Sequence, residues 1–214
     1  MAALDMQEQE HIDALKAWWK ENGKWLLLTV ALTLAGVAAI RGWQTYQGNQ
    51  AGEASTLYAE MEKQLQSNDP KRINDAATAV MDKFGSTAYA PRAALTAAQV
   101  NIQIKDMARA KTQLQWVIDH ARESGLQNVA RLKLASILLD EKNYMEALKL
   151  LEATDDNVFI GLYADLKGDV LSAQGKTEEA RAAYKQALDK IEAKSSYRNL
   201  VQIKLDALGS AQGS

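Results

Sequence analysis

The side chains that could carry chemistry are few in this sequence. Cysteine is absent, which excludes disulfides, thiolate nucleophiles and cysteine-based metal sites. The two histidines, His11 and His120, are far apart in the chain, and neither belongs to a His-x-x-x-His pair. No glycine-rich phosphate loop and no Gly-x-Ser-x-Gly sequence occurs. His120, next to Asp119 near the end of a predicted helix, does not make an active site. We therefore predict no catalytic residue, no metal site, no cofactor and no enzymatic activity.

The composition favours an all-α protein without a surface for nucleic acid. Ala, Leu, Gln, Lys and Glu dominate, whereas there are only 2 prolines and 2 phenylalanines. The dominant residues are strong helix formers. The formal net charge is −2, and beyond residue 44 acidic and basic side chains are almost equal in number. A nucleic-acid-binding domain would show a basic excess, so the expected partners are proteins and a lipid bilayer.

The longest apolar stretch runs from residue 25 to residue 40 and is interrupted only by Thr29 and Thr33. As a helix rising about 1.5 Å per residue it covers roughly 24 Å, and flanking residues extend it towards the roughly 30 Å of a bilayer core. Long basic side chains reach the headgroups from the ends of such a helix, and indole rings favour the interface. The predicted interface anchors are Trp18, Trp19, Lys24, Trp25, Arg41 and Trp43.

We interpret residues 23–43 as a single transmembrane helix and weigh two alternatives. A buried core helix would not need basic residues and tryptophans at both ends. A cleaved signal peptide would explain the small residues Val37, Ala38 and Ala39. However, the segment before the apolar stretch is long, acidic and without a concentrated positive start. A membrane anchor is the interpretation we prefer.

Basic residues near the span predict its orientation. Lys16, Lys20 and Lys24 precede the span, whereas Arg41 is followed by no further Lys or Arg until Lys63. Basic flanks stay in the cytoplasm, so the tail of residues 1–22 is expected there and the rest of the chain in the periplasm.

The second half of the cytoplasmic tail has helical spacing of apolar residues. It either lies along the membrane face as an amphipathic helix or simply extends the spanning helix. Asn22 and Gly23 are compatible with a break and with a tolerated irregularity.

Beyond the membrane, helix boundaries are marked by local signals. A helix over residues 44–66 is expected to follow the span and to end before Asp69, which is a plausible N-cap with Pro70 at the first helical position. The next helix is expected to stop at Gly85. A last amphipathic helix over residues 196–208 can cover the apolar end of a repeat array. Residues 209–214 are predicted to be a disordered tail.

From residue 89 onward the sequence repeats itself. Three segments share one pattern, and they begin at Lys105, Lys142 and Gly175. Each starts with a turn residue, continues with polar residues, and then has an alanine followed by a large apolar residue. A further small residue lies upstream of each alanine, on the preceding predicted helix. Small residues at such places let two antiparallel helices pack closely. The alanines are Ala110, Ala147 and Ala180, and the upstream small residues are Ala98, Ala135 and Gly168.

This pattern resembles the tetratricopeptide repeat, a helix–turn–helix unit of about 34 residues. The match is closest over residues 161–194, although the usual opening Trp and closing Pro are missing. The resemblance implies an α-solenoid of helical hairpins over residues 44–208, with a concave groove lined by the first helix of each hairpin. The groove candidates are Arg92, Leu95, Gln99, Ile102, Gln103, Val129, Leu132, Ser136, Leu139, Asp140, Leu162, Asp165 and Asp169.

The composition of this groove argues against capture of a terminal carboxylate. The predicted lining has one arginine and an acidic end, and it mixes aliphatic with polar groups. Such a surface suits a folded partner domain or a loosely held extended chain. The alternative is that Leu95, Leu132 and Leu139 are buried by neighbouring helices and the groove is filled.

The whole chain resembles the YfgM family, described as ancillary subunits of the bacterial SecYEG translocon. The likeness covers residues 7–208 and rests on the order of the parts of the chain. Residues 18–24 lead into one span and residues 41–43 follow it. Degenerate repeats come next, and they include residues 89–99 and 164–175. It implies an inner-membrane protein with a periplasmic domain beside the translocon. It also implies a membrane-anchored chaperone of the peptidyl-prolyl isomerase type (PpiD-like) as partner, to which unfolded secreted chains are passed.

The residues alone predict a membrane-tethered helical scaffold that binds polypeptide, because tethering raises its effective concentration at other membrane proteins. The alternative class is an adaptor that regulates envelope stress signalling or the assembly of a cell-envelope complex.

Overall fold

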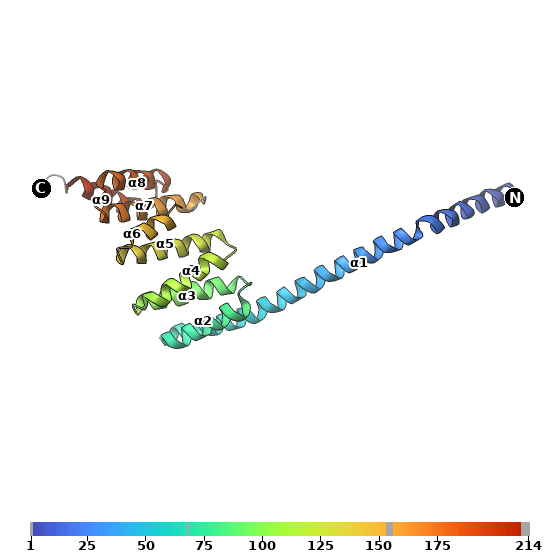
Figure 1. Ribbon diagram of the computed structural model, residues 1–214, viewed down its shortest axis with the longest axis horizontal. Helices are drawn as coiled ribbons and strands as arrows, with labels where there is room; N and C mark the ends of the chain where they lie inside the picture. The colour runs from blue at the N-terminus through green and yellow to red at the C-terminus, as the bar shows by residue number, and fades with distance from the viewer. Residues whose placement is uncertain (1, 68, 153–155, 211–214) are drawn as a thin grey trace. The chain divides into compact units, whose positions relative to one another are not determined.

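The computed structural model describes residues 2–67, 69–152 and 156–210, and these residues form helices and connecting turns without a β-strand (Figure 1). The predicted all-α class is confirmed. The chain divides into two compact units, residues 1–50 and 51–214. The helices are α1 (Ala2–Ser67), α2 (Pro70–Phe84), α3 (Tyr89–Gln103), α4 (Met107–His120), α5 (Ser124–Asp140), α6 (Tyr144–Leu150), α7 (Asn157–Ala173), α8 (Thr177–Lys190) and α9 (Tyr197–Ser210).

The first unit consists of α1 up to residue 50. Its helix contains a stretch that is long and apolar enough to cross a membrane, and almost none of that stretch is buried. Trp25 and Leu32 expose 71% and 65% of their surface, which contradicts the alternative of a buried core helix. The hydroxyls of Thr29 and Thr33 each donate to the carbonyl four residues earlier at 2.8 Å. The polar groups inside the apolar stretch are therefore satisfied within the helix, as a bilayer requires.

The helix does not break at Gly23. The ring of Trp19 lies over this glycine, so close that a β-carbon there would be 3.1 Å from the indole. Of the predicted interface anchors, Trp18, Trp19, Trp25 and Trp43 all expose about half of their surface or more. The tail and the span are thus one helix, and its indoles are available to an interface.

In the second unit, helices α2 to α9 follow one another as a stack of antiparallel pairs, running from green to red in Figure 1. The last turns of α1 complete the first pair: Met61 is fully buried in a core with Ile73, Ala77 and Val80 of α2 and with α3. Asp69 caps α2, its Oδ1 accepting from the backbone N–H groups of Lys71 and Arg72 at 3.1 and 3.2 Å. The predicted cap and the predicted end of α2 before Gly85 are both confirmed.

The turns between paired helices repeat in atomic detail. Lys105, Lys142 and Gly175 all have positive φ, at 63°, 61° and 75°. The residue after each of them donates its N–H to a carbonyl five residues earlier, at 2.8, 2.8 and 2.9 Å. This arrangement is the Schellman ending of a helix, which needs one residue in the left-handed region. The three turns fall on the residues that begin the predicted repeats, so the predicted register is confirmed.

The small residues of the repeat lie at helix contacts, as predicted. Ala98, Ala110, Ala135, Ala147 and Ala180 are fully buried. At Gly168 a β-carbon would be 2.4 Å from the ring of Tyr184. These side chains are small because the paired helices approach closely there.

Helix α9 covers the end of the stack. Val201 is fully buried, and Leu205 and Leu208 pack against the core formed by α7 and α8. The helix runs to Ser210, two residues further than predicted. The remainder of the predicted disordered tail, residues 211–214, lies outside the described residues.

Candidate protein-binding groove

The predicted groove residues lie on α3, α5 and α7, the first helices of three successive hairpins. Gln103, Ser136 and Asp140 are exposed. One residue, Asp165, is buried, with 2% of its surface exposed. The rest are partly exposed: Arg92, Leu95, Gln99, Ile102, Val129, Leu132, Leu139, Leu162 and Asp169.

Side-chain contacts fix the spacing of these three helices. Lys133 Nζ of α5 donates to Gln99 Oε1 of α3 at 2.8 Å. Both terminal nitrogens of Arg92 contact the carboxylate of Glu123, just before α5, at 3.0 and 2.9 Å. The hydroxyl of Tyr163 on α7 donates to Asn128 Oδ1 on α5 at 2.9 Å. The face that carries the candidates is therefore held by bonds between neighbouring hairpins.

The leucines of the predicted groove are half-buried. Leu95, Leu132 and Leu139 pack against the main core and keep part of their surface exposed. They line a surface whose base is the core of the solenoid.

The acidic end of the predicted groove is not open. Lys204 of α9 places its Nζ 3.0 and 2.8 Å from the two carboxylate oxygens of Asp165 and 2.7 Å from Asp169 Oδ2. Tyr197 donates to Asp165 at 2.5 Å, and Tyr184 donates to Asp169 at 2.8 Å. The prediction of Asp165 as a residue of the binding surface is therefore wrong, because its carboxylate is buried against Lys204. Asp169 mainly holds α9 through its contact with Lys204. The physical reason is that an isolated carboxylate is costly to bury, whereas one paired with an ammonium group and a hydroxyl is not.

This cluster changes the acidity of the groups that meet in it. Burial raises the pKa of Tyr184, and its hydrogen bond to Asp169 raises it further. Burial also raises the pKa of Tyr197, and its hydrogen bond to Asp165 raises it further. Burial lowers the pKa of Lys204, but the hydrogen bonds to Asp165 and Asp169 outweigh it, and the net pKa is raised. The ammonium group and both phenols thus keep their protons more firmly in the folded chain.

Depressions of about 430–660 Å³ occur at several places on the second unit, and one of them includes three of the predicted groove residues. It has a volume of about 500 Å³ and lies where α1, α2, α3 and α5 meet. We call it the aliphatic groove. Its apolar lining is Leu65, Pro70, Ile73, Leu95, Val100 and Ile104, and its polar lining is Thr96, Gln99, Gln103 and Lys133.

Sequence reasoning found only part of this groove. Leu95, Gln99 and Gln103 were predicted, whereas Leu65, Val100, Ile104 and Lys133 were not. Leu65 and Ile104 expose 37% and 49% of their surface. A large apolar residue at Ile104, immediately before the turn residue Lys105, was the available signal, because such turns are usually polar.

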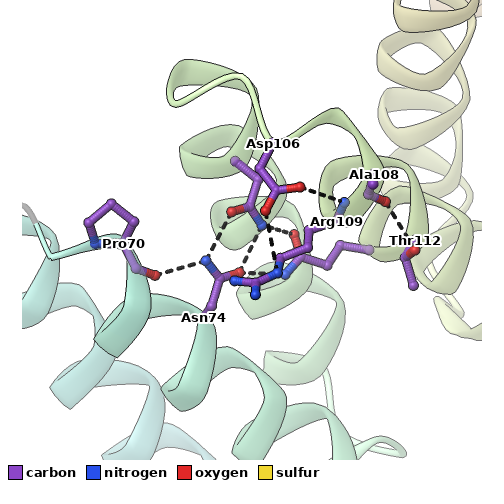
Figure 2. Close-up of polar contacts among 8 residues, drawn as sticks. Pro70, Asn74, Asp106, Ala108, Arg109 and Thr112 are labelled. Carbon is purple, nitrogen blue, oxygen red and sulfur yellow. Dashed lines mark hydrogen bonds and ion pairs between the residues drawn. The ribbon is translucent and has the colours of Figure 1, made fainter.

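A buried cluster of three amides holds the helices beneath the aliphatic groove. Asn74 of α2 and Asn101 of α3 exchange hydrogen bonds at 2.9 and 2.8 Å. Gln113 of α4 accepts from Asn101 at 2.7 Å and donates to Asn74 at 2.8 Å. Figure 2 shows Asn74 between the carbonyl of Pro70 and the start of α4, where Asp106 caps the helix. Each amide is satisfied, so the cluster is a specific joint between α2, α3 and α4.

Among the side chains that the structure describes, no hydrogen bond or ion pair joins His11 or His120 to a carboxylate. The ring of His120 is stacked on Trp116 with centroids 4.4 Å apart, and its Nδ1 donates to the Trp116 carbonyl at 2.9 Å. Within the described ranges, no group of three or more His, Asp or Glu side chains is arranged to hold a metal ion.

Known proteins are similar to this chain over most of its length. The model of the tetratricopeptide repeat-like domain family matches residues 16–210. A protein of Neisseria gonorrhoeae named ancillary SecYEG translocon subunit is 32% identical over 207 residues, which cover 96% of this chain and 99% of the relative. Proteins with the same name from Haemophilus influenzae and Escherichia coli are 28% and 26% identical, covering 86% and 94% of this chain and 90% and 96% of the relatives.

Proposed function

The chain belongs to the tetratricopeptide repeat-like family of ancillary SecYEG translocon subunits, and on that premise we propose that it is a non-enzymatic, membrane-anchored scaffold that binds polypeptides beside the Sec translocon. The observation that carries the proposal is the end-to-end match to a relative of that name in a chain that joins an exposed apolar helix to a repeat domain. A groove on the second unit, lined by aliphatic and polar side chains, supports the proposal.

We propose that residues 23–43 span the bacterial inner membrane once, with residues 1–22 in the cytoplasm and the repeat domain in the periplasm. The basic residues Lys16, Lys20 and Lys24 before the span support this orientation. Protease added to spheroplasts should then degrade the repeat domain and leave the N-terminal tail protected, and the untreated protein should keep its full mass. A soluble product that begins near Ile40 would instead indicate a cleaved signal peptide.

The groove of α3 and α5 is the proposed contact surface for a partner protein. The partner we expect, from the family resemblance, is a membrane-anchored chaperone of the peptidyl-prolyl isomerase type, to which secreted chains are passed. Exposed parts of Leu132 and Leu139 support a contact there, because partly exposed aliphatics at a groove are typical of protein-binding surfaces.

A double substitution tests this surface. Leu132→Glu with Leu139→Glu should abolish crosslinks to the partner while circular dichroism shows an unchanged fold. Met145→Glu is the matched control, because Met145 exposes 82% of its surface on α6, away from the groove. If the double variant unfolds, the leucines act as core residues. If it stays folded and keeps its crosslinks, the contact lies on another face.

The identity of the crosslinked proteins separates this function from the alternative one. In-cell crosslinking followed by mass spectrometry should recover translocon subunits and nascent secreted chains. Recovery of a dedicated stress regulator or of cell-envelope assembly proteins, without the translocon, would favour the adaptor instead.

A further inference from the structure

The aliphatic groove exposes apolar surface that the chain itself does not cover. Leu65 near the end of α1 and Ile104, the residue after α3, keep 37% and 49% of their surface exposed. Both line the depression of about 500 Å³ together with the partly exposed Leu95 and Val100. No aromatic ring belongs to the lining residues. A ligand that removes this surface from water gains free energy in proportion to the aliphatic area it covers.

The polar lining is made of groups that bind a polypeptide backbone. Thr96, Gln99 and Gln103 follow one another at helical spacing along α3. The Thr96 hydroxyl donates to the Arg92 carbonyl and Gln99 Oε1 accepts from Lys133, so a ligand would meet the hydroxyl oxygen, the Gln99 NH2 group and the Gln103 amide, which together offer donors and acceptors of hydrogen bonds. Next to aliphatic contacts, such groups suit an extended chain whose backbone groups are not already used in secondary structure.

The charge of the groove points to one further feature of its ligand. Lys133 is the charged member of the lining, and its Nζ donates to the neutral amide of Gln99. Other partly exposed basic groups of the same unit do have carboxylate partners: Arg92 pairs with Glu123, and Lys111 pairs with Glu141. No carboxylate of the described residues lies within ion-pair distance of Lys133. The groove therefore carries one positive charge that no described carboxylate compensates.

We propose that the aliphatic groove binds an extended polypeptide segment that has aliphatic side chains and one carboxylate, and that this carboxylate contacts Lys133. This inference rests on the proposed function as a polypeptide-binding scaffold and names the class of segment that it selects. Complementary charge at a groove adds specificity more than affinity, so Lys133 decides which aliphatic segments are preferred.

Matched peptides test this preference on the full chain in detergent micelles. The probe is a fluorescently labelled, acetylated and amidated ten-residue peptide of alternating Ser and Val with Glu at its centre, and its twin has Gln there. Fluorescence anisotropy at low ionic strength should give the Glu peptide an affinity about two- to fivefold higher, as expected for one partly exposed ion pair. In Lys133→Gln the two affinities should become equal. In the control Lys149→Gln, which removes an exposed lysine of α6, the preference should remain.

A second variant tests the apolar half of the site. Ile104→Ser should weaken both peptides alike and leave their ratio unchanged, because it removes aliphatic contact without touching Lys133. Equal affinities in the wild type, a preference that survives Lys133→Gln, or no measurable binding of either peptide would overturn the inference. Crosslinks to the translocon, measured on the same variants, report on the proposed function separately: their presence without peptide discrimination rejects only the groove inference.

Discussion

Gly168 of α7 lies directly against the ring of Tyr184 of α8, so that a β-carbon at residue 168 would be 2.4 Å from the ring carbon Cε1. The ring is not free to move away, because it is 97% buried and its hydroxyl donates to Asp169 Oδ1 at 2.8 Å. The absence of a side chain at residue 168 therefore sets the distance between the two helices.

Replacing Gly168 with Ala should destabilise the repeat domain by about 1–2 kcal/mol. Overpacking costs about 1–3 kcal/mol, and an approach of 2.4 Å to a buried ring places this site in the upper half of that range, so the gain in helix propensity of about 1 kcal/mol offsets only part of the cost. Urea denaturation of the full chain in detergent, followed by circular dichroism, measures the change. Gly125→Ala is the control, because nothing lies within 4 Å of its β-carbon position and a small gain is expected. A Gly168→Ala variant as stable as the wild type would contradict this account of the contact.

Lys142→Gly should stabilise the domain by about 0.5–1 kcal/mol. Lys142 has a φ of 61°, and a side chain in this left-handed region is unfavourable by about 1 kcal/mol, whereas glycine is not strained there. Gly175 already occupies the equivalent turn with a φ of 75°. Thermal melting provides the measurement. Lys142→Ala has the same strain as the lysine and should bring no gain, so a gain from both substitutions would point to another cause.

Removing Lys204 should destabilise the end of the solenoid by about 2–3 kcal/mol, because Asp165 would remain buried without its cation. Lys204→Met combined with Asp165→Asn should recover part of that loss, since the uncompensated charge is gone. Hydrogen exchange of α9 and the denaturation midpoint of both variants measure the coupling. Additive losses in the double variant would mean that the two groups do not act as a pair.

The stability of the domain should fall as the pH rises above about 10. Tyr184, Tyr197 and Lys204 all have a raised pKa in the folded chain, above the ordinary values of 10.0 for tyrosine and 10.5 for lysine. At alkaline pH the folded state therefore binds more protons than the unfolded state. The stabilisation from these three groups is fully present below their ordinary pKa values and is lost as the pH rises above those values. Denaturation midpoints between about pH 8 and 11 measure this. Tyr184→Phe with Tyr197→Phe should flatten the decline, and an equally steep decline would exclude the two phenols as its source.

Asn101→Leu should destabilise the domain by about 1–3 kcal/mol or more. The substitution leaves Gln113 Oε1 without its donor and removes the two hydrogen bonds between Asn74 and Asn101, and an unsatisfied buried polar group costs about that much. Thermal melting measures the loss. Asn199→Leu, on the exposed surface of α9, should change stability by less than about 0.5 kcal/mol. Similar effects at both positions would show that the amide cluster contributes nothing specific.

The elements of this protein were predictable from sequence because their signals are local. The apolar stretch of residues 25–40 predicts an exposed membrane-spanning helix, and the structure has a helix there. Asp69 and Pro70 predict the start of α2 from the needs of its first backbone N–H groups. The repeat of Lys105, Lys142 and Gly175 predicts the register of the hairpins, since each such turn needs one residue of positive φ.

The binding surface depended on contacts between residues distant in the chain, and these only the packing of the helices decided. Asp165 has the position of a groove residue on α7, yet Lys204, 39 residues further on, buries and neutralises it. The aliphatic groove brings together Leu65 of α1, Ile104 after α3 and Lys133 of α5. These residues meet only because the hairpins stack. Periodicity reports which face of a helix is apolar. It does not report which neighbouring helix covers that face, because burial and charge compensation are properties of the assembled domain.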